Sequence, residues 1–156
     1  RRLQQIEMVV AATPGYWHAH GRPDHPRELS THRTLAMAPP GETPHWQFNV
    51  GGKLLDLPLR AVFTATDFSP LVPLALKGVG VVRGSRMLMG DWIEAGKLEP
   101  LFAQYSPRNL WLYAAYAQRR NPSAALRALL DFLEEQRRQP PSGDAEEPPG
   151  AARLDT

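Results

Sequence analysis

Residues 60–82 read RAVFTATDFSPLVPLALKGVGVV, and this stretch decides the fold class. Residues 60–65 favour β-structure and predict a strand, and residues 79–82 predict a second strand that is short and buried. Between them we expect a helix that begins at Thr66 and Asp67, either of which can cap it, and that ends at Gly78. A helix that joins two strands is typical of a mixed α/β fold.

Strands and helical segments also alternate toward the N-terminus. Apolar runs predict strands over residues 6–12 and 34–38. Thr13 is the expected N-cap of a short helix over residues 14–20, because proline suits the first helical position that follows it. A helical turn is expected over residues 26–30. The α/β pattern therefore extends over the first forty residues.

A β-hairpin interrupts the alternation. Residues 46–50 alternate apolar and polar side chains, as a half-buried strand does, and residues 54–57 form the returning strand. Gly51 and Gly52 supply the positive φ angles of a tight turn. Pro58 places the returning strand at an edge or ends it there.

The C-terminal third continues the pattern and ends in a helix. We expect a helix over residues 85–95, an extended segment over 98–102 and a core strand over 110–116. The last helix is capped by Asn121 and frays from Glu134 onward. Its apolar residues have helical spacing: Leu126, Leu129, Leu130 and Leu133.

The composition excludes several classes of protein. Hydrophobic residues make up 42% of the 156 residues and charged residues 22%, as in an ordinary globular protein. No window approaches the ~18 apolar residues of a membrane-spanning helix, so we expect no membrane partner. The chain has no cysteine, which excludes disulfides, thiolate-bound zinc, iron–sulfur clusters and cysteine nucleophiles. A reducing, cytoplasmic compartment is compatible with this composition.

The charge pattern argues against a nucleic-acid-binding surface. The formal net charge is +2 at pH 7. Residues 140–156 are net acidic and poor in apolar side chains, so we expect a disordered tail there and a mildly basic remainder. The basic residues are spread along the chain and do not form a dense stripe. We therefore expect negligible DNA binding by these residues themselves.

No residue pattern typical of catalysis or metal binding stands out. His18 and His20 are two positions apart, so on a helix they point to different faces and cannot hold one ion together. The other histidines lack ligand-like spacing, and we interpret all five as solvated. The GxSxG, Walker-type and GxGxxG motifs are also missing. We expect neither enzymatic activity nor a metal or cofactor.

Three junctions that follow predicted strands indicate a ligand site. Residues 66–69 begin the predicted helix, where free backbone amides and the helix dipole favour an anion. Thr13 and Arg83 hold similar positions after their own strands. If the junctions converge at one edge of the sheet, they form a polar cleft for a small anionic ligand. Simple helix capping by Thr66 or Asp67 is the alternative interpretation.

Each predicted ligand-binding residue has an expected role. The hydroxyls of Thr66 and Ser69 would hold a carboxylate, and Phe68 would pack on the apolar body of the ligand. The guanidinium of Arg83 suits a carboxylate, although a solvated arginine at a strand end is the alternative. Asp67 opposes anion binding unless its carboxylate turns away to cap the helix. The full set is Thr13, Thr66, Asp67, Phe68, Ser69, Val82 and Arg83.

Short motifs over residues 1–136 occur in the order known from one protein family. They are RRL at 1–3, VVAATPGY at 9–16, HPREL at 25–29, WQF at 46–48, LPLRA at 57–61, TD at 66–67, LALKGVG at 74–80, IEAGKLEPL at 93–101, LYAAY at 112–116 and LLDFL at 129–133. In this order they resemble the effector-binding domain of LysR-type transcriptional regulators. One departure is Arg83-Gly84, where the family usually has Leu-Pro.

The resemblance implies the type 2 periplasmic-binding-protein-like fold, with two lobes. Residues 1–100 would form the complete second lobe with its hinge entry. Residues 101–139 would supply the return strand and the C-terminal helix of the first lobe, and residues 140–156 the disordered tail. The rest of the first lobe, and the winged helix-turn-helix of the family, are expected to be absent from this chain.

The resemblance also implies a function. The chain would sense a small effector between two lobes, would form homo-oligomers, and would reach DNA only through the winged helix-turn-helix. A solute-binding protein of the same fold, acting as a monomeric carrier, is the alternative. A small enzyme on this fold has no supporting residue pattern. Sedimentation discriminates the first two, since regulators of this type associate through their effector domains.

Overall fold

The computed structural model describes residues 2–113, 115 and 124–138 of the chain. The chain divides into two compact units, Gln5–Leu112 and a smaller one made of Arg1–Gln4 with Tyr113–Thr156. The expected lobe boundary between residues 100 and 101 stays a prediction. The expected disorder of residues 140–156 also stays a prediction, because these residues lie outside the described ones.

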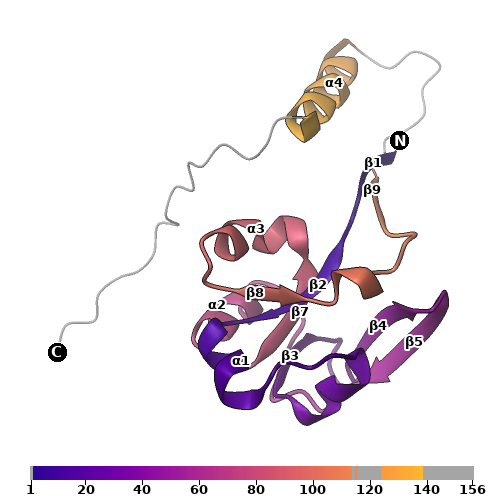
Figure 1. Cartoon of the computed structure of the whole chain (residues 1–156). Helices are drawn as coiled ribbons and strands as arrows, with labels where there is room; N and C mark the ends of the chain where they lie inside the picture. Colours follow the sequence, from indigo (N-terminus) through magenta and orange to yellow (C-terminus); the bar gives the residue numbers. More distant parts are fainter. Residues whose placement is uncertain (1, 114, 116–123, 139–156) are drawn as a thin grey trace. The chain divides into compact units, whose positions relative to one another are not determined.

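A five-stranded mixed sheet forms the centre of the larger unit (Figure 1). Its strand order is β6 (Phe63–Ala65), β3 (Thr34–Met37), β7 (Val81–Ser85), β2 (Met8–Ala12) and β8 (Glu99–Leu101). The strands β6, β3 and β7 run parallel to one another, whereas β2 is antiparallel to both β7 and β8. The expected mixed α/β fold is therefore confirmed.

Helices α2 (Leu71–Leu76) and α3 (Arg86–Glu94) cover one face of this sheet (Figure 1). Alternate residues of the strands point to this face and pack against the helices. The fully buried members of this cluster include Val9, Ala11, Leu35, Leu71, Val82, Met89 and Leu98. Burial of such side chains is worth about 1.5–3 kcal/mol each and is the main force that holds the layers together.

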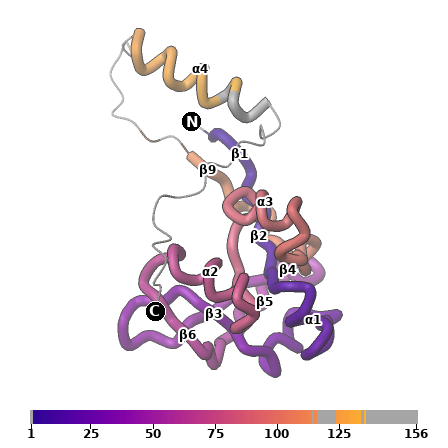
Figure 2. The backbone as a smooth tube through the Cα atoms, turned by 90° about the vertical axis from the view of Figure 1, so that its left-hand side faces the viewer, coloured from indigo at the N-terminus to yellow at the C-terminus, as the bar shows by residue number. Residues whose placement is uncertain are grey.

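The opposite face is covered by shorter elements. They are helix α1 (Pro14–His20), the 3₁₀ turns η1 (Pro26–Thr31) and η2 (Ala103–Tyr105), and the hairpin of β4 (His45–Val50) with β5 (Lys53–Pro58). Their buried residues include Tyr16, Trp17, Leu29, Trp46, Phe48, Leu57 and Phe102. The turned view of Figure 2 follows the chain through these segments. The sheet thus has two separate apolar clusters, one on each face.

The remaining elements lie near the chain ends. Strands β1 (Arg2–Gln5) and β9 (Trp111–Tyr113) pair in a two-stranded sheet. Leu112 and Tyr113 are exposed, so the described part of the core strand predicted over residues 110–116 is not fully buried, since a two-stranded sheet has few neighbours to cover it. Residues 114 and 116 lie outside the described residues.

Helix α4 (Ala124–Arg138) of the smaller unit confirms the predicted C-terminal helix. Its Leu130 is buried, whereas Leu129 and Leu133 are exposed. The predicted cap, Asn121, lies outside the described residues.

Local signals placed several elements correctly. Helix α1 covers the predicted residues, and the hydroxyl of its cap, Thr13, accepts the Tyr16 amide at 3.1 Å. Ser85 caps α3 in the same way through Leu88. Both caps satisfy amides that have no partner within their helix. These two helix starts are confirmed.

Two boundaries differ from expectation, and both affect the predicted ligand site. Helix α2 begins at Leu71 instead of Thr66, after Pro70, and no side chain caps it. Strand β7 continues to Ser85, so Arg83 lies within a strand and not at its end. Pairing with β2, in which Val10 lies opposite Arg83, extends β7 beyond its apolar run.

Candidate functional site

The ends of the three parallel strands define one edge of the sheet. Met37 of β3 pairs with Ala65 of β6, so both strands leave the sheet at the same level. The antiparallel strand β2 enters at this edge, because Met8 lies opposite Ser85. In open α/β sheets the carboxyl edge of the parallel strands is where ligands bind. We call this region, formed by residues 66–69, Arg86 and Glu7, the carboxyl edge.

Residues 66–69 form a turn at the carboxyl edge and not the start of a helix. The Asp67 carboxylate accepts the Ser69 amide at 2.8 Å. Hydrogen bonds from the Ser69 side chain and from its amide lower the pKa of Asp67, so this exposed carboxylate is ionised at neutral pH. The Ser69 amide and hydroxyl are therefore already hydrogen-bonded to the carboxylate of Asp67. The helix-dipole argument for this position was wrong, because the six-residue α2 starts further on.

Phe68 anchors this turn to the sheet. A Cβ atom at Gly84 would lie 2.5 Å from Cζ of Phe68, so the ring sits directly against the β7 backbone. Phe68 packs against the cluster that the two helices cover, and part of its ring remains exposed. Glycine at position 84 is what permits this close approach.

Arg83 points to the opposite face of the sheet from Phe68. Its guanidinium carbon lies 5.0 Å from the ring centroid of Phe48, and its Nη2 donates to the carbonyl of Gln47 at 2.5 Å. Burial lowers the pKa of Arg83 to about 10, and no carboxylate of the described ranges lies within ion-pair distance of it. Through these two contacts Arg83 of β7 links the sheet to the β4–β5 hairpin.

Thr13 and Val82 also lie away from the carboxyl edge. Because β2 runs opposite to β7, Thr13 leaves the sheet at the far edge, where its hydroxyl is 3.8 Å from the Cβ position of Gly78. Val82 is fully buried in the core. The structure therefore brings together Thr66, Asp67, Phe68 and Ser69, and separates Thr13, Val82 and Arg83 from them.

Sequence reasoning missed an ion pair at the carboxyl edge. Nε of Arg86 lies 3.7 Å from the carboxylate of Glu7, and the Arg86 amide donates to the Glu7 carbonyl at 2.8 Å. Both side chains are about half exposed. The two residues are 79 positions apart in the sequence, so no local pattern could have paired them.

The histidines are less uniform than the sequence indicated. His32 is half-buried, with Nδ1 3.3 Å from the Tyr16 hydroxyl, which also accepts the Arg33 amide at 3.0 Å. Burial, followed by the nearby His20, lowers the pKa of His32. The imidazole of His20 stacks on the Tyr16 ring with 4.2 Å between the centroids. His32 is therefore part of a partly buried polar cluster with Tyr16 and is not a fully solvated side chain.

In residues 2–113, 115 and 124–138, no three His, Asp or Glu side chains gather in a way that could hold a metal ion. None of the helices in the same ranges is long and apolar enough to cross a membrane.

Comparison with known proteins identifies the class to which this fold belongs. Residues 1–138 match the LysR substrate binding domain family, and the chain belongs to that family. The solved regulatory domain of CrgA, a LysR-type transcriptional regulator from Neisseria meningitidis, superposes with a TM-score of 0.71 at 31% identity. The match covers 87% of this chain and 67% of that domain. The resemblance and the periplasmic-binding-protein-like fold are confirmed.

The sequence relatives are bacterial regulators and a shorter protein. CrgA of N. meningitidis serogroup B is 33% identical over 137 residues, which are 87% of this chain and 46% of CrgA. YcaN, an HTH-type transcriptional regulator of Escherichia coli K12, is 28% identical over 129 residues, 82% of this chain and 42% of YcaN. YagP of the same organism, a LysR-family substrate-binding-domain protein, is 31% identical over 112 residues, 70% of this chain and 82% of YagP. The chain thus spans less than half the length of the two regulators.

Proposed function

We propose that this chain is the ligand-sensing part of a LysR-type transcriptional regulator, and that a small effector with an anionic group binds at the carboxyl edge, between two lobes. Membership of the substrate-binding-domain family supports the sensing role. The single observation that carries the location is that residues 66–69, Arg86 and Glu7 all lie at the carboxyl edge of the three parallel strands.

The residues of the carboxyl edge have distinct proposed roles. The exposed Thr66 hydroxyl and the guanidinium of Arg86 would bind the anionic group, and Phe68 would contact the apolar part of the effector. Asp67 and Ser69 hold the turn in shape through their mutual hydrogen bonds. Arg86 takes the place that the sequence assigned to Arg83, because it faces this edge.

The remaining partners follow from the family. Effector binding would change the relative position of the two lobes and, through an N-terminal winged helix-turn-helix, the affinity for DNA. The proposed role needs no catalytic step and no cofactor, and it places the protein in the cytoplasm with the DNA that it regulates. A gel-shift experiment with this chain should show no tight operator binding at physiological salt; tight binding would contradict the assignment.

The proposal includes a homo-oligomer, for which β6 offers a surface. This strand is at the edge of the sheet, and its Phe63 is 39% exposed, beside Val62 at 48%. Exposed apolar groups on an unpaired edge strand are typical of an interface. Sedimentation of the chain should show association, and Phe63→Lys should weaken it. A strictly monomeric chain would instead favour the solute carrier.

Calorimetric titration tests the site itself. The chain is titrated with a panel of aromatic and aliphatic carboxylic acids, and the best ligand is carried to the variants. Thr66→Val and Arg86→Gln should each weaken it about tenfold, whereas Thr13→Val, at the far edge, should not. Binding that is unchanged in both edge variants, or weakened equally by Thr13→Val, would show that the site lies elsewhere.

A further inference from the structure

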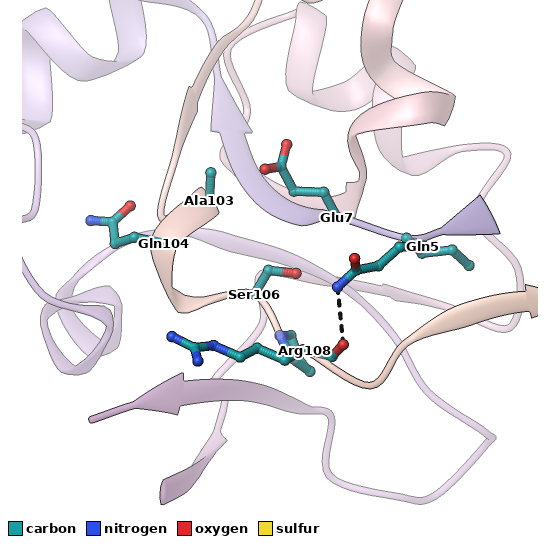
Figure 3. A pocket seen from close by; sticks show the side chains of 8 residues that line it. Gln5, Glu7, Ala103, Gln104, Ser106 and Arg108 are labelled. Atoms are coloured by element: carbon teal, nitrogen blue, oxygen red, sulfur yellow. Dashed lines mark hydrogen bonds between the residues drawn. The ribbon is translucent and has the colours of Figure 1, made fainter. Parts of the chain in front are cut away.

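A cavity lies in the larger unit, and its lining does not include residues 66–69. It has a volume of about 290 Å³, at the lower end of the range for small-molecule sites. Two segments form its walls, residues 5–7 before β2 and residues 103–108 after β8 (Figure 3). We call it the crossover pocket. Its lining consists of Gln5, Ile6, Glu7, Ala103, Gln104, Ser106, Pro107 and Arg108.

Hydrogen bonds between the two segments build the walls. The Ser106 hydroxyl accepts the Met8 amide at 2.8 Å, and the Gln5 side chain donates to the Arg108 carbonyl at 3.0 Å. The Ile6 amide donates to the Leu110 carbonyl at 2.8 Å. These bonds satisfy the backbone on both sides and hold the segments side by side. The charged groups of Glu7 and Arg108 take no part in these bonds.

The charged groups of the crossover pocket are of opposite sign. Figure 3 shows Glu7 on one side, Arg108 on the other and Ser106 between them. The carboxylate of Glu7 lies 3.7 Å from Nε of Arg86, which is longer than a hydrogen bond. No carboxylate within the described ranges forms an ion pair with Arg108, whose side chain is exposed. A molecule with both an ammonium and a carboxylate group would complement the two ends of this pocket.

The apolar part of the lining limits the size of such a molecule. Ile6, Ala103 and Pro107 provide short apolar contacts beside the charged groups. Together with the small volume, they fit a compact side chain on a charged backbone. We propose that the crossover pocket binds a small zwitterion of the α-amino-acid class, with its ammonium at Glu7 and its carboxylate at Arg108. The crossover pocket shares Glu7 with the carboxyl edge, whereas Arg108 and the rest of its lining lie outside that region, and the proposal does not rest on the proposed effector site.

Binding of a zwitterion in the crossover pocket would affect the two segments that line it and the Glu7–Arg86 ion pair. Residues 5–7 and 103–108 lead directly to the two places, after Gln4 and after Leu112, where the chain passes between its compact units. A bound zwitterion would contact both of these segments, which hydrogen bonds already hold side by side. Its ammonium would also compete with Arg86 for Glu7, since both are cations near one carboxylate.

Titration with amino acids and matched analogues tests the proposal. The chain is titrated calorimetrically with the L-amino acids, and the best binder is compared with its desamino acid and its decarboxylated amine. The zwitterion should bind at least about tenfold more tightly than either analogue. Glu7→Gln and Arg108→Gln should each weaken it about tenfold, and the first should abolish the preference over the desamino acid. Amide chemical shifts of residues 5–7 and 103–108 should move on binding.

Matched variants separate this site from the effector site. Glu94→Gln and Arg27→Gln remove the same charges from exposed positions outside the pocket and should leave amino-acid binding unchanged. Thr66→Val should also leave it unchanged, so a failure of the effector site is visible independently. The proposal is overturned if no amino acid binds, if an analogue binds equally well, or if Thr66→Val and Arg108→Gln have the same effect.

Discussion

Replacement of Arg83 by methionine should change the free energy of unfolding by no more than about 1 kcal/mol, although the side chain is half-buried against Phe48. Burial lowers the pKa of Arg83 to about 10. At about 1.4 kcal/mol per pKa unit, holding this charge in the folded state costs about 3 kcal/mol. The contact with Phe48 returns up to about 2 kcal/mol, and the charged hydrogen bond to Gln47 about 1.5–3 kcal/mol. These contributions nearly cancel.

Methionine removes both the cost and the two interactions while its side chain still fills most of the space. Arg83→Ala serves as the comparison, because it also leaves a cavity under Phe48 and should lose about 2 kcal/mol or more. Urea unfolding followed by tryptophan fluorescence measures both variants. A loss above about 3 kcal/mol in Arg83→Met would refute the reasoning and show that the guanidinium is strongly stabilising.

Three further perturbations test other parts of the structure. The pKa of His32 is lowered in the folded state, so near and below the ordinary histidine pKa of 6.5 the unfolded state binds more protons than the folded state. The free energy of unfolding should therefore decrease as the pH falls below 6.5. His32→Gln should flatten this pH dependence, as measured by urea titrations at several pH values. Gly84→Ala should cost about 1–3 kcal/mol by displacing Phe68, whereas Gly90→Ala, with no atom within 4 Å of its Cβ, should gain about 0.5–1 kcal/mol in thermal melts. Thr13→Ala should lower the unfolding free energy by about 1 kcal/mol through loss of the α1 cap and leave effector affinity unchanged in calorimetry.

Several elements were predictable because their signals are local. Helix α1 follows from a threonine cap before a proline, and the β4–β5 hairpin from two glycines between alternating strands. The boundary of α2 was not predictable in the same way. The Asp67 carboxylate accepts a hydrogen bond from a nearby backbone amide both when it caps a helix and when it forms a turn with Ser69. The local sequence therefore does not distinguish the two structures. The ordered motifs indicated the family without any knowledge of the contacts between them.

The sequence by itself determined the alternation of strands and helices, the hairpin and the family, because hydrophobic period, capping and turn residues act within a few positions of one another. Only the tertiary structure decided which predicted site residues meet. The antiparallel pairing of β2 with β7 sends Thr13 to the far edge of the sheet, and the pleat turns Arg83 away from Phe68. The same pairing brings Glu7 to Arg86. Strand direction and register depend on contacts between residues far apart in the chain, and a local pattern does not encode them.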